Sequence, residues 1–165
     1  MPMRGVLPVT ALALLLAVSA LPGCLQEPSG GGRGVTVTLR IEFAPEAPSA
    51  FQGNVTEWTP DGHGNWSVTS HNATDGKAVY IVHDLTAGTA LGALLAGASA
   101  AGFEVRHHSE SMGAFVDSVA GVENGRSGHY WSYYVNGEYG TVSSDRADLS
   151  GGDTVRWVYL GSPVG

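Results

Sequence analysis

Residues 35–43 alternate strictly between apolar and polar side chains. The apolar members are Val35, Val37, Leu39, Ile41 and Phe43. Because successive side chains of a strand point to opposite faces, the alternation predicts an antiparallel strand with one buried and one exposed face. It is the clearest secondary-structure signal in the chain.

The alternation stops at Ala44. Residues 44–76 contain three prolines and the turn signals Asp61-Gly62 and Asp75-Gly76, with one short strand expected at Trp66–Ser70. We therefore expect a loop-rich insertion after the first strand.

Three N-glycosylation acceptor sequences lie within this insertion. They begin at Asn54, Asn65 and Asn72, whereas the other two Asn residues of the chain, Asn124 and Asn136, precede glycines. Such tripeptides are short, so chance is the alternative for any one of them. Their clustering favours a glycan-bearing lobe, which must be exposed at the surface.

One helix is expected in the second half. Leu91, Leu94, Leu95 and Ala98 follow the i, i+3, i+4, i+7 spacing of an apolar helix face about twelve residues long. Thr89 is suited to the N-cap and Gly102 to the C-terminal stop. Small side chains on the remaining face would let the helix lie close against a sheet; they are Ala93, Gly97, Ala100 and Ala101.

The pattern of the rest of the second half, together with residues 77–84, predicts short strands and turns. Strands are expected at 77–84, 103–107, 113–119, 129–135 and 154–160, with a turn-rich loop at 121–128. Asn136-Gly137 predicts a tight turn that leads into a return strand from Glu138.

Two motifs of the C-terminal half resemble a known family. They are Tyr130-Trp131-x-Tyr133-Tyr134-Val135-Asn136-Gly137 and Leu149-x-Gly151-Gly152-Asp153-x-Val155-x-Trp157-x-Tyr159. With the Thr89-x-Leu91-x-x-Leu94 helix start and the Phe115–Val119 strand, they resemble an uncharacterised prokaryotic domain family related to the C-terminal domain of transcobalamin and intrinsic factor. The resemblance covers residues 35–159 outside the insertion. It implies an α+β fold, with a small β-grasp-like mixed sheet packed on one helix.

The resemblance also suggests a ligand. In the animal cobalamin carriers this domain forms one wall of a ligand sandwich whose other wall is a helical barrel, which this chain is too short to contain. Cobalamin binding therefore does not follow from the fold, and cobalamin or another corrinoid is a candidate ligand in cooperation with a partner protein.

Six aromatic side chains are candidates for stacking on such a ligand. They are Tyr130, Trp131, Tyr133, Tyr134, Trp157 and Tyr159. The alternative is that Trp131, Tyr133 and Val135 form core while Tyr130 and Tyr134 merely cover the other face of the sheet.

Metal binding and catalysis have little support in the sequence. His107 and His108 are adjacent, so on a strand they point to opposite faces and cannot share an ion without a bulge, even with His129 nearby. No nucleophile elbow or glycine-rich phosphate loop is found. We expect solvated histidines, no metal and no enzyme activity.

The N-terminus predicts export and anchoring. Arg4, an apolar run and small residues form a signal peptide over residues 1–23, and the run is shorter than the roughly 18–20 residues that span a bilayer. Leu21-x-Gly-Cys24 resembles the lipobox of prokaryotic lipoproteins, although Pro22 departs from it, and it implies a lipid on Cys24. The alternative is an ordinary secretory signal or an uncleaved anchor with an incidental Cys.

Two further regions are expected after the signal peptide ends at residue 23. Residues 24–34 are rich in Gly, Ser and Pro and predict a flexible tether, followed by the domain at 35–165.

Charge and cysteine content limit the classes of function that the chain can have. The chain has 15 acidic and 8 basic residues, a net charge of −7 and no basic run, which argues against nucleic acid as a partner. Its single Cys excludes an intramolecular disulfide. We expect a lipid-anchored, non-catalytic binding module on the extracytoplasmic face of the cell membrane, working with an envelope or transporter protein. The alternative is a structural or adhesion module of the envelope that takes no small ligand.

Overall fold

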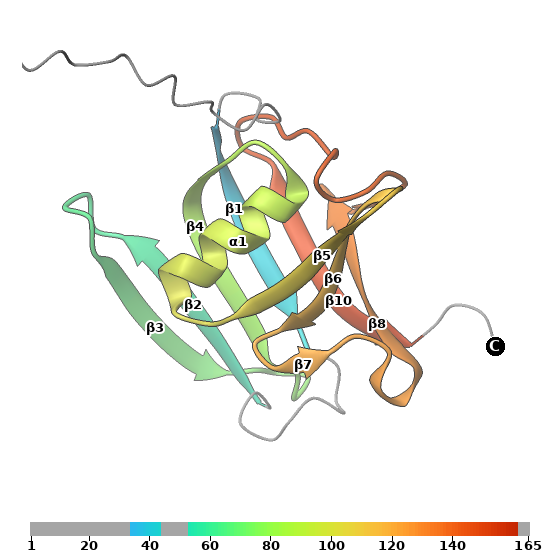
Figure 1. Ribbon diagram of the computed structural model, residues 1–165. Coiled ribbons are helices and arrows are strands. Elements are labelled where there is room, and N and C mark those ends of the chain that lie inside the picture. Colours follow the sequence, from blue (N-terminus) through green and yellow to red (C-terminus); the bar gives the residue numbers. More distant parts are fainter. Residues whose placement is uncertain (1–33, 44–52, 162–165) are drawn as a thin grey trace, which may run out of the picture.

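A computed structural model of the chain describes residues 34–43 and 53–161. These residues form an α+β fold with a large mixed sheet, a small antiparallel sheet and one α-helix (Figure 1). The α+β class expected from the sequence is confirmed, while the finer β-grasp description stays a prediction. The signal peptide, Cys24 and all but the last residue of the tether lie outside the described residues.

Ten strands, one α-helix and one 3₁₀ turn follow one another along the described part of the chain. They are β1 (Val35–Glu42), β2 (Asn54–Pro60), β3 (Trp66–Asn72), β4 (Val79–Ala87), α1 (Ala90–Ala101), β5 (Val105–Glu110), β6 (Gly113–Val119), β7 (Val122–Glu123), a 3₁₀ turn (Arg126–Gly128), β8 (His129–Val135), β9 (Glu138–Tyr139) and β10 (Thr154–Gly161).

The large sheet has the strand order β3-β2-β4-β1-β10-β8-β9, and the small sheet the order β5-β6-β7. Strand β1 lies at the centre of the large sheet, where Leu39 is opposite Val82 of β4 and Val155 of β10. The pairing with β4 is antiparallel and the pairing with β10 is parallel. The antiparallel strand expected at 35–43 is therefore confirmed on one side only.

A single core lies on one face of the large sheet. Val37, Leu39 and Ile41 of β1 are almost completely buried there, as the alternation predicts, whereas Val35 at the start of the strand is only partly buried. Helix α1 packs against β4 and β1, while the small sheet adds Val116, Val119 and Val122 to the same core beside β8 and β10. In Figure 1 the helix and the small sheet lie next to each other in front of the large sheet.

Helix α1 begins and ends where its caps were expected. The Thr89 hydroxyl accepts a 3.1 Å hydrogen bond from the Gly92 N–H, and Gly102 adopts a left-handed conformation with φ 74°. Gly97 is buried against Leu39, and a Cβ at Gly97 would overlap the Leu39 side chain. The small face of the helix thus allows the close approach to the sheet that the sequence predicts.

The segment after β1 contains more regular structure than expected. The sequence predicts one strand at Trp66–Ser70, but β2 and β3 form a hairpin, and β2 extends the large sheet by pairing parallel to β4. The expectation of a loop-rich insertion is thus corrected for residues 53–76, whereas residues 44–52 lie outside the described part of the chain. Trp58 helps to attach β2 to β4, because its ring packs edge-on against the ring of Tyr80 on β4, with 5.1 Å between the ring centroids.

Candidate functional site

The six aromatic candidates are divided between the two faces of the sheet. Trp131, Tyr133, Trp157 and Tyr159 are buried on the face that carries the helix and the small sheet. Because side chains alternate along β8, Tyr130 and Tyr134 point the other way. The structure therefore favours the core assignment for Trp131 and Tyr133, and extends it to the two aromatics of β10.

The buried aromatics use their polar atoms within the fold. Trp131 donates from Nε1 to the Val122 carbonyl at 2.9 Å, and the Tyr159 hydroxyl lies 2.8 Å from the Glu123 carbonyl. Trp157 donates to the Ala90 carbonyl at 3.4 Å. A buried N–H or O–H needs such a partner, so these bonds indicate structural roles.

The two outward aromatics differ from each other. Tyr130 is exposed, whereas the Tyr134 ring lies 4.5 Å from the Arg156 guanidinium carbon in a cation–π contact. Tyr134 also meets Tyr139 edge-on at 5.5 Å. This arrangement brings Tyr139, which was not among the sequence candidates, next to the predicted aromatic strand.

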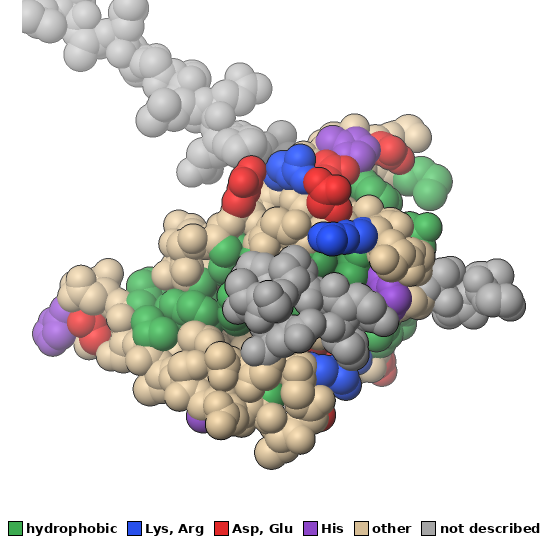
Figure 2. Space-filling model, turned by 90° about the horizontal axis from the view of Figure 1, so that it is seen from below, with side chains coloured by type: hydrophobic (Ala, Val, Ile, Leu, Met, Phe, Trp, Pro, Cys, Tyr) green, Lys and Arg blue, Asp and Glu red, His purple; other side chains and the backbone are tan. Residues whose placement is uncertain are grey.

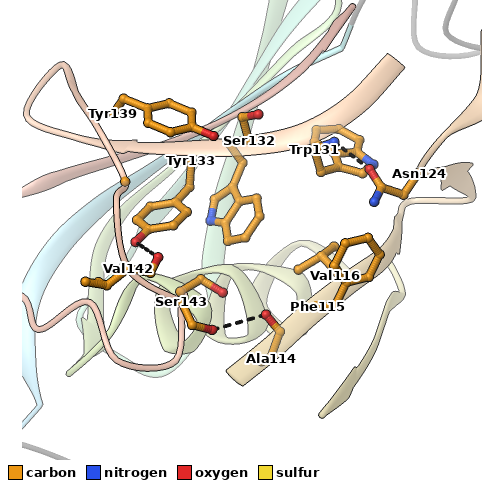
Figure 3. A pocket seen from close by; sticks show the side chains of 13 residues that line it. Ala114, Phe115, Val116, Asn124, Trp131, Ser132, Tyr133, Tyr139, Val142 and Ser143 are labelled. Atoms are coloured by element: carbon orange, nitrogen blue, oxygen red, sulfur yellow. Dashed lines mark hydrogen bonds between the residues drawn. The ribbon is translucent and has the colours of Figure 1, made fainter. Parts of the chain in front are cut away.

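Tyr139 belongs to a groove that the sequence did not predict. Three adjoining pockets of about 190, 370 and 430 Å³ share Tyr139 and Val142. The smallest lies between β6, β8 and the segment after β9, whose side chains face one another in Figure 3. We call the largest one, together with its lining, the loop groove; it is lined by Glu110, Met112, Gly113, Ala114, Phe115, Tyr139, Thr141, Val142 and Ser143.

Four large apolar side chains are exposed in the loop groove. The exposed fractions are 81% for Met112, 61% for Tyr139, 55% for Val142 and 44% for Phe115. Isolated apolar residues on a surface are ordinary, but a contiguous group around a depression is typical of an interaction site. Met112 in particular has a flexible side chain that can adapt to the shape of a ligand.

The connecting segment at 140–147 is fixed to the body of the protein. The Tyr133 hydroxyl donates to the Val142 carbonyl at 2.6 Å, and the Ala114 N–H donates to Asp145 Oδ1 at 3.1 Å. Ser143 donates to the same Asp145 carboxylate, and this bond, followed by the one from Ala114, holds the pKa of Asp145 below its usual value. The groove is therefore largely preformed.

The N-terminus of α1 provides further attachment for this segment. The N–H groups of Leu91 and Ala90 donate to the carbonyls of Ser144 and Ala147 at 2.9 and 3.1 Å. The first N–H groups of a helix have no partner within the helix, so these carbonyls satisfy them while positioning the groove.

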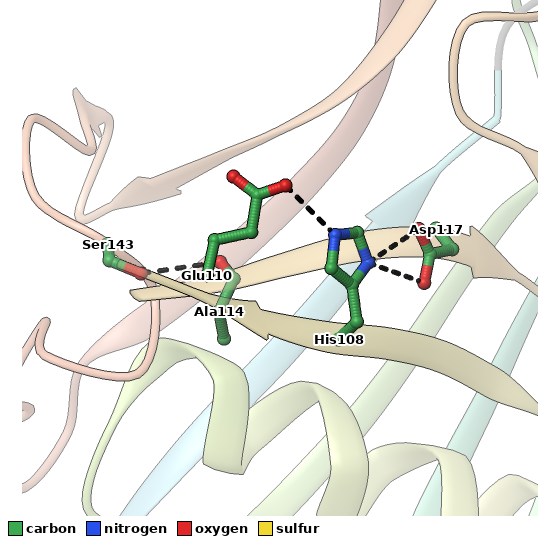
Figure 4. A network of polar contacts seen from close by, with 5 residues as sticks. All are labelled: His108, Glu110, Ala114, Asp117 and Ser143. Atoms are coloured by element: carbon green, nitrogen blue, oxygen red, sulfur yellow. Dashed lines mark hydrogen bonds and ion pairs between the residues drawn. The ribbon is translucent and has the colours of Figure 1, made fainter. Parts of the chain in front are cut away.

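A carboxylate–histidine–carboxylate cluster lies beside the loop groove (Figure 4). His108 Nδ1 lies 3.0 Å from Asp117, and His108 Nε2 lies 3.1 Å from Glu110. The hydrogen bond to Asp117 and then that to Glu110 raise the pKa of His108 above its usual 6.5. The His108 ring also contacts Phe115, with 5.4 Å between ring centroids, so the cluster supports one wall of the groove.

Other charged residues accompany this cluster on the small sheet. Arg106 pairs with Glu123 at 2.8 Å across the sheet. Figure 2 shows acidic, basic and His side chains close together along the upper edge of that view.

Among residues 34–43 and 53–161, no group of three or more His, Cys, Asp or Glu residues is arranged to hold a metal ion. Both ring nitrogens of His108 lie within hydrogen-bond distance of a carboxylate, while His129 Nδ1 lies 3.0 Å from the Ser127 carbonyl. The absence of a metal site and of catalysis stays an expectation for the whole chain.

The three acceptor asparagines lie on the β2–β3 hairpin. Asn54 and Asn72 are cross-strand neighbours at one end, Asn65 lies at the turn at the other end, and all three are exposed.

Within the described part of the chain, no helix is long and apolar enough to cross a membrane.

Comparison with known proteins gives limited matches. No curated protein matches the chain. A crystal structure of a proposed metal-binding protein from Ruminococcus gnavus is 15% identical with a TM-score of 0.42, over 78% of this chain and 98% of that one. Haptocorrin in complex with Cbi is 13% identical with a TM-score of 0.39, over 66% of this chain, which spans only 25% of haptocorrin. A family model described as a domain of unknown function (DUF4430) matches residues 87–161, from the end of β4 through α1 to the end of β10.

Proposed function

We propose that this protein is a non-catalytic binding module that holds a small ligand in the loop groove, with a partner protein covering the open side. The observation that carries the proposal is the group of four exposed apolar side chains around one depression, which are Met112, Phe115, Tyr139 and Val142. Their supporting segment is tied to β6, β8 and α1 by hydrogen bonds, so little ordering entropy is lost when a ligand binds.

The dimensions of the groove favour the involvement of a partner protein. A pocket of about 430 Å³ is within the range of small-molecule sites, but it is open to solvent along one side. A corrinoid or another flat ligand, which the sequence resemblance suggests, would leave much of its surface uncovered here. An envelope or transporter protein that covers the remaining surface would complete the site.

We further propose that the module lies on the extracytoplasmic face of the cell membrane. Its anchor is a lipid on Cys24, with the tether separating the domain from the bilayer. The exposed positions of Asn54, Asn65 and Asn72 support glycans on the β2–β3 hairpin, on strands that do not line the groove.

Equilibrium dialysis against cobinamide and cobalamin tests the ligand. We expect saturable binding by the full chain carrying Cys24→Ser, and a loss of roughly fivefold in affinity for Val142→Ser, because about 1 kcal/mol of apolar contact is removed. Val68→Ser is the matched control, since Val68 is 57% exposed, like Val142 at 55%, but lies on β3. This control should bind as the parent protein does.

The competing function is a structural or adhesion module that takes no small ligand. Absence of saturable binding to either corrinoid, or equal losses in Val142→Ser and Val68→Ser, would favour that alternative and overturn the groove as a ligand site.

A further inference from the structure

Strand β3 is one of the two outer strands of the large sheet. Among the described residues only β2 pairs with it, through the register Asn54↔Asn72 to Pro60↔Trp66. A strand of seven residues is about 23 Å long at the usual rise. An outer strand of that length can add a strand from a second chain through its main-chain N–H and C=O groups.

The sequence of β3 lacks the usual protection against such pairing. Residues 66–72 include no Lys, Arg, Asp, Glu or Pro, and six of the seven residues are exposed. Val68 exposes 57% of its surface. Although the whole chain carries a charge of −7, two copies brought together along β3 would meet no charged side chain on either strand.

Two acceptor asparagines flank this strand. Asn65 directly precedes β3 and Asn72 is its last residue. The Asn65 side chain donates to Asp61 Oδ2 at 3.1 Å and its backbone N–H donates to Asp61 Oδ1 at 3.0 Å, so its place at the end of the strand is fixed. Asn54 lies on the inner strand β2 and provides a natural comparison.

We propose that N-linked glycans on Asn65 and Asn72 prevent β3 from pairing with β3 of a second copy of this chain. This inference rests on the surface location and glycans proposed above. A bulky polar group at each end of the strand would occupy the space that an incoming strand needs, and thereby replaces the charged residues that protect other outer strands.

The modification requires a lipid-linked oligosaccharide phosphate as donor. The Asn Nδ2 forms a bond to the anomeric carbon of the sugar, and the bond from that carbon to the donor's phosphate oxygen breaks. The phosphate leaves with the electron pair, and the amide loses one proton to a base of the transferase. The substituted amide keeps one N–H, so Asn65 can retain its hydrogen bond to Asp61.

The test uses the full chain with Cys24→Ser, secreted from a host that performs N-glycosylation. Intact mass and peptide mapping determine which asparagines are modified, and sedimentation velocity over a wide concentration range determines the association state. We expect a glycosylated monomer for the parent and for Asn54→Gln. The Asn65→Gln/Asn72→Gln double variant should self-associate, and adding Val68→Lys to it should restore the monomer.

Enzymatic removal of glycans from the folded parent protein repeats the test in case the double variant does not fold. Unmodified Asn65 and Asn72, a double variant or deglycosylated parent that stays monomeric, or association that persists with Val68→Lys would each overturn the proposal. Corrinoid dialysis on the same samples reports on the loop groove separately, so failure of one proposal is distinguishable from failure of the other.

Discussion

The hydroxyl of Tyr133 donates a 2.6 Å hydrogen bond to the carbonyl oxygen of Val142. A buried residue of β8 thereby holds the segment whose exposed side chain lines the loop groove. Partial burial raises the pKa of the Tyr133 hydroxyl above its usual value of 10.0, so it remains a proton donor throughout the neutral range. Gly140 lies against the same ring, where a Cβ would overlap it.

Tyr133→Phe keeps the ring and removes only this hydrogen bond. We expect the free energy of unfolding to fall by about 0.5–1.5 kcal/mol, the usual contribution of one such bond, and the affinity of the loop groove to weaken. Urea unfolding measures the first effect and corrinoid dialysis the second. Tyr130→Phe is the control, because Tyr130 is an exposed tyrosine of the same strand. Equal effects of the two substitutions would contradict the assigned role of Tyr133.

Gly97→Ala tests the close contact between α1 and β1. Alanine favours a helix over glycine by about 1 kcal/mol, but the new Cβ overlaps fully buried Leu39. Overpacking of a core costs about 1–3 kcal/mol, so we expect a net loss of stability in thermal unfolding. The exposed Ser99 of the same helix provides the control Ser99→Ala, and a rise in melting temperature for Gly97→Ala would show that the contact is not tight.

The elements that could be predicted are those whose signals are local. The alternation at 35–43 predicted β1, and the spacing of leucines with Thr89 and Gly102 predicted α1 with its caps. Asn136 at φ 51° and Gly137 at φ 88° form the expected tight turn after β8. Each of these depends on neighbours within a few residues, so no tertiary information was needed.

The strand β2 was missed because its pattern is not amphipathic. Most of its residues are partly exposed on both faces, since it lies near the edge of the sheet beyond the reach of the helix. Only Trp58 signals burial, and its partner Tyr80 is distant in the sequence.

The loop groove could not be predicted for a similar reason. Met112 and Phe115 come from the β5–β6 hairpin, whereas Tyr139 and Val142 follow β8, and only the packed fold brings the two segments together. Four of the six aromatic residues predicted as ligand contacts instead form part of the core; they are Trp131, Tyr133, Trp157 and Tyr159. An available signal was Val142 itself, an apolar residue among Gly, Thr and Ser in a segment without periodicity.

Cys24→Ser tests the anchor predicted from the sequence. If Cys24 carries the lipid, the parent protein should partition with membranes, and the variant should be recovered in the soluble fraction with a mass that lacks the lipid. The parent chain treated with detergent serves as the control for release. Unchanged membrane partitioning of Cys24→Ser would instead support an uncleaved apolar anchor.

The His108 cluster predicts a pH dependence of stability. Its hydrogen bonds to Asp117 and Glu110 raise the folded-state pKa of His108 above the unfolded value of about 6.5. A raised pKa means that the folded state binds the proton more tightly, so the stabilisation is complete below pH 6.5 and is lost as the pH rises through the folded-state pKa. The three side chains are solvent-exposed, so added salt should reduce the effect.

His108→Gln removes the titrating group and should remove this dependence. The parent should be more stable than the variant at pH 6 and should lose that advantage at alkaline pH, as measured by urea unfolding at low ionic strength, because only the protonated imidazole attracts both carboxylates. His107→Gln, on the same strand but outside the cluster, should leave the pH dependence unchanged. A titration of the imidazole signals by NMR locates the raised pKa directly. If the advantage of the parent instead grew with rising pH, the cluster would not stabilise the protonated histidine, and its support of Phe115 at the groove would have to arise from packing alone.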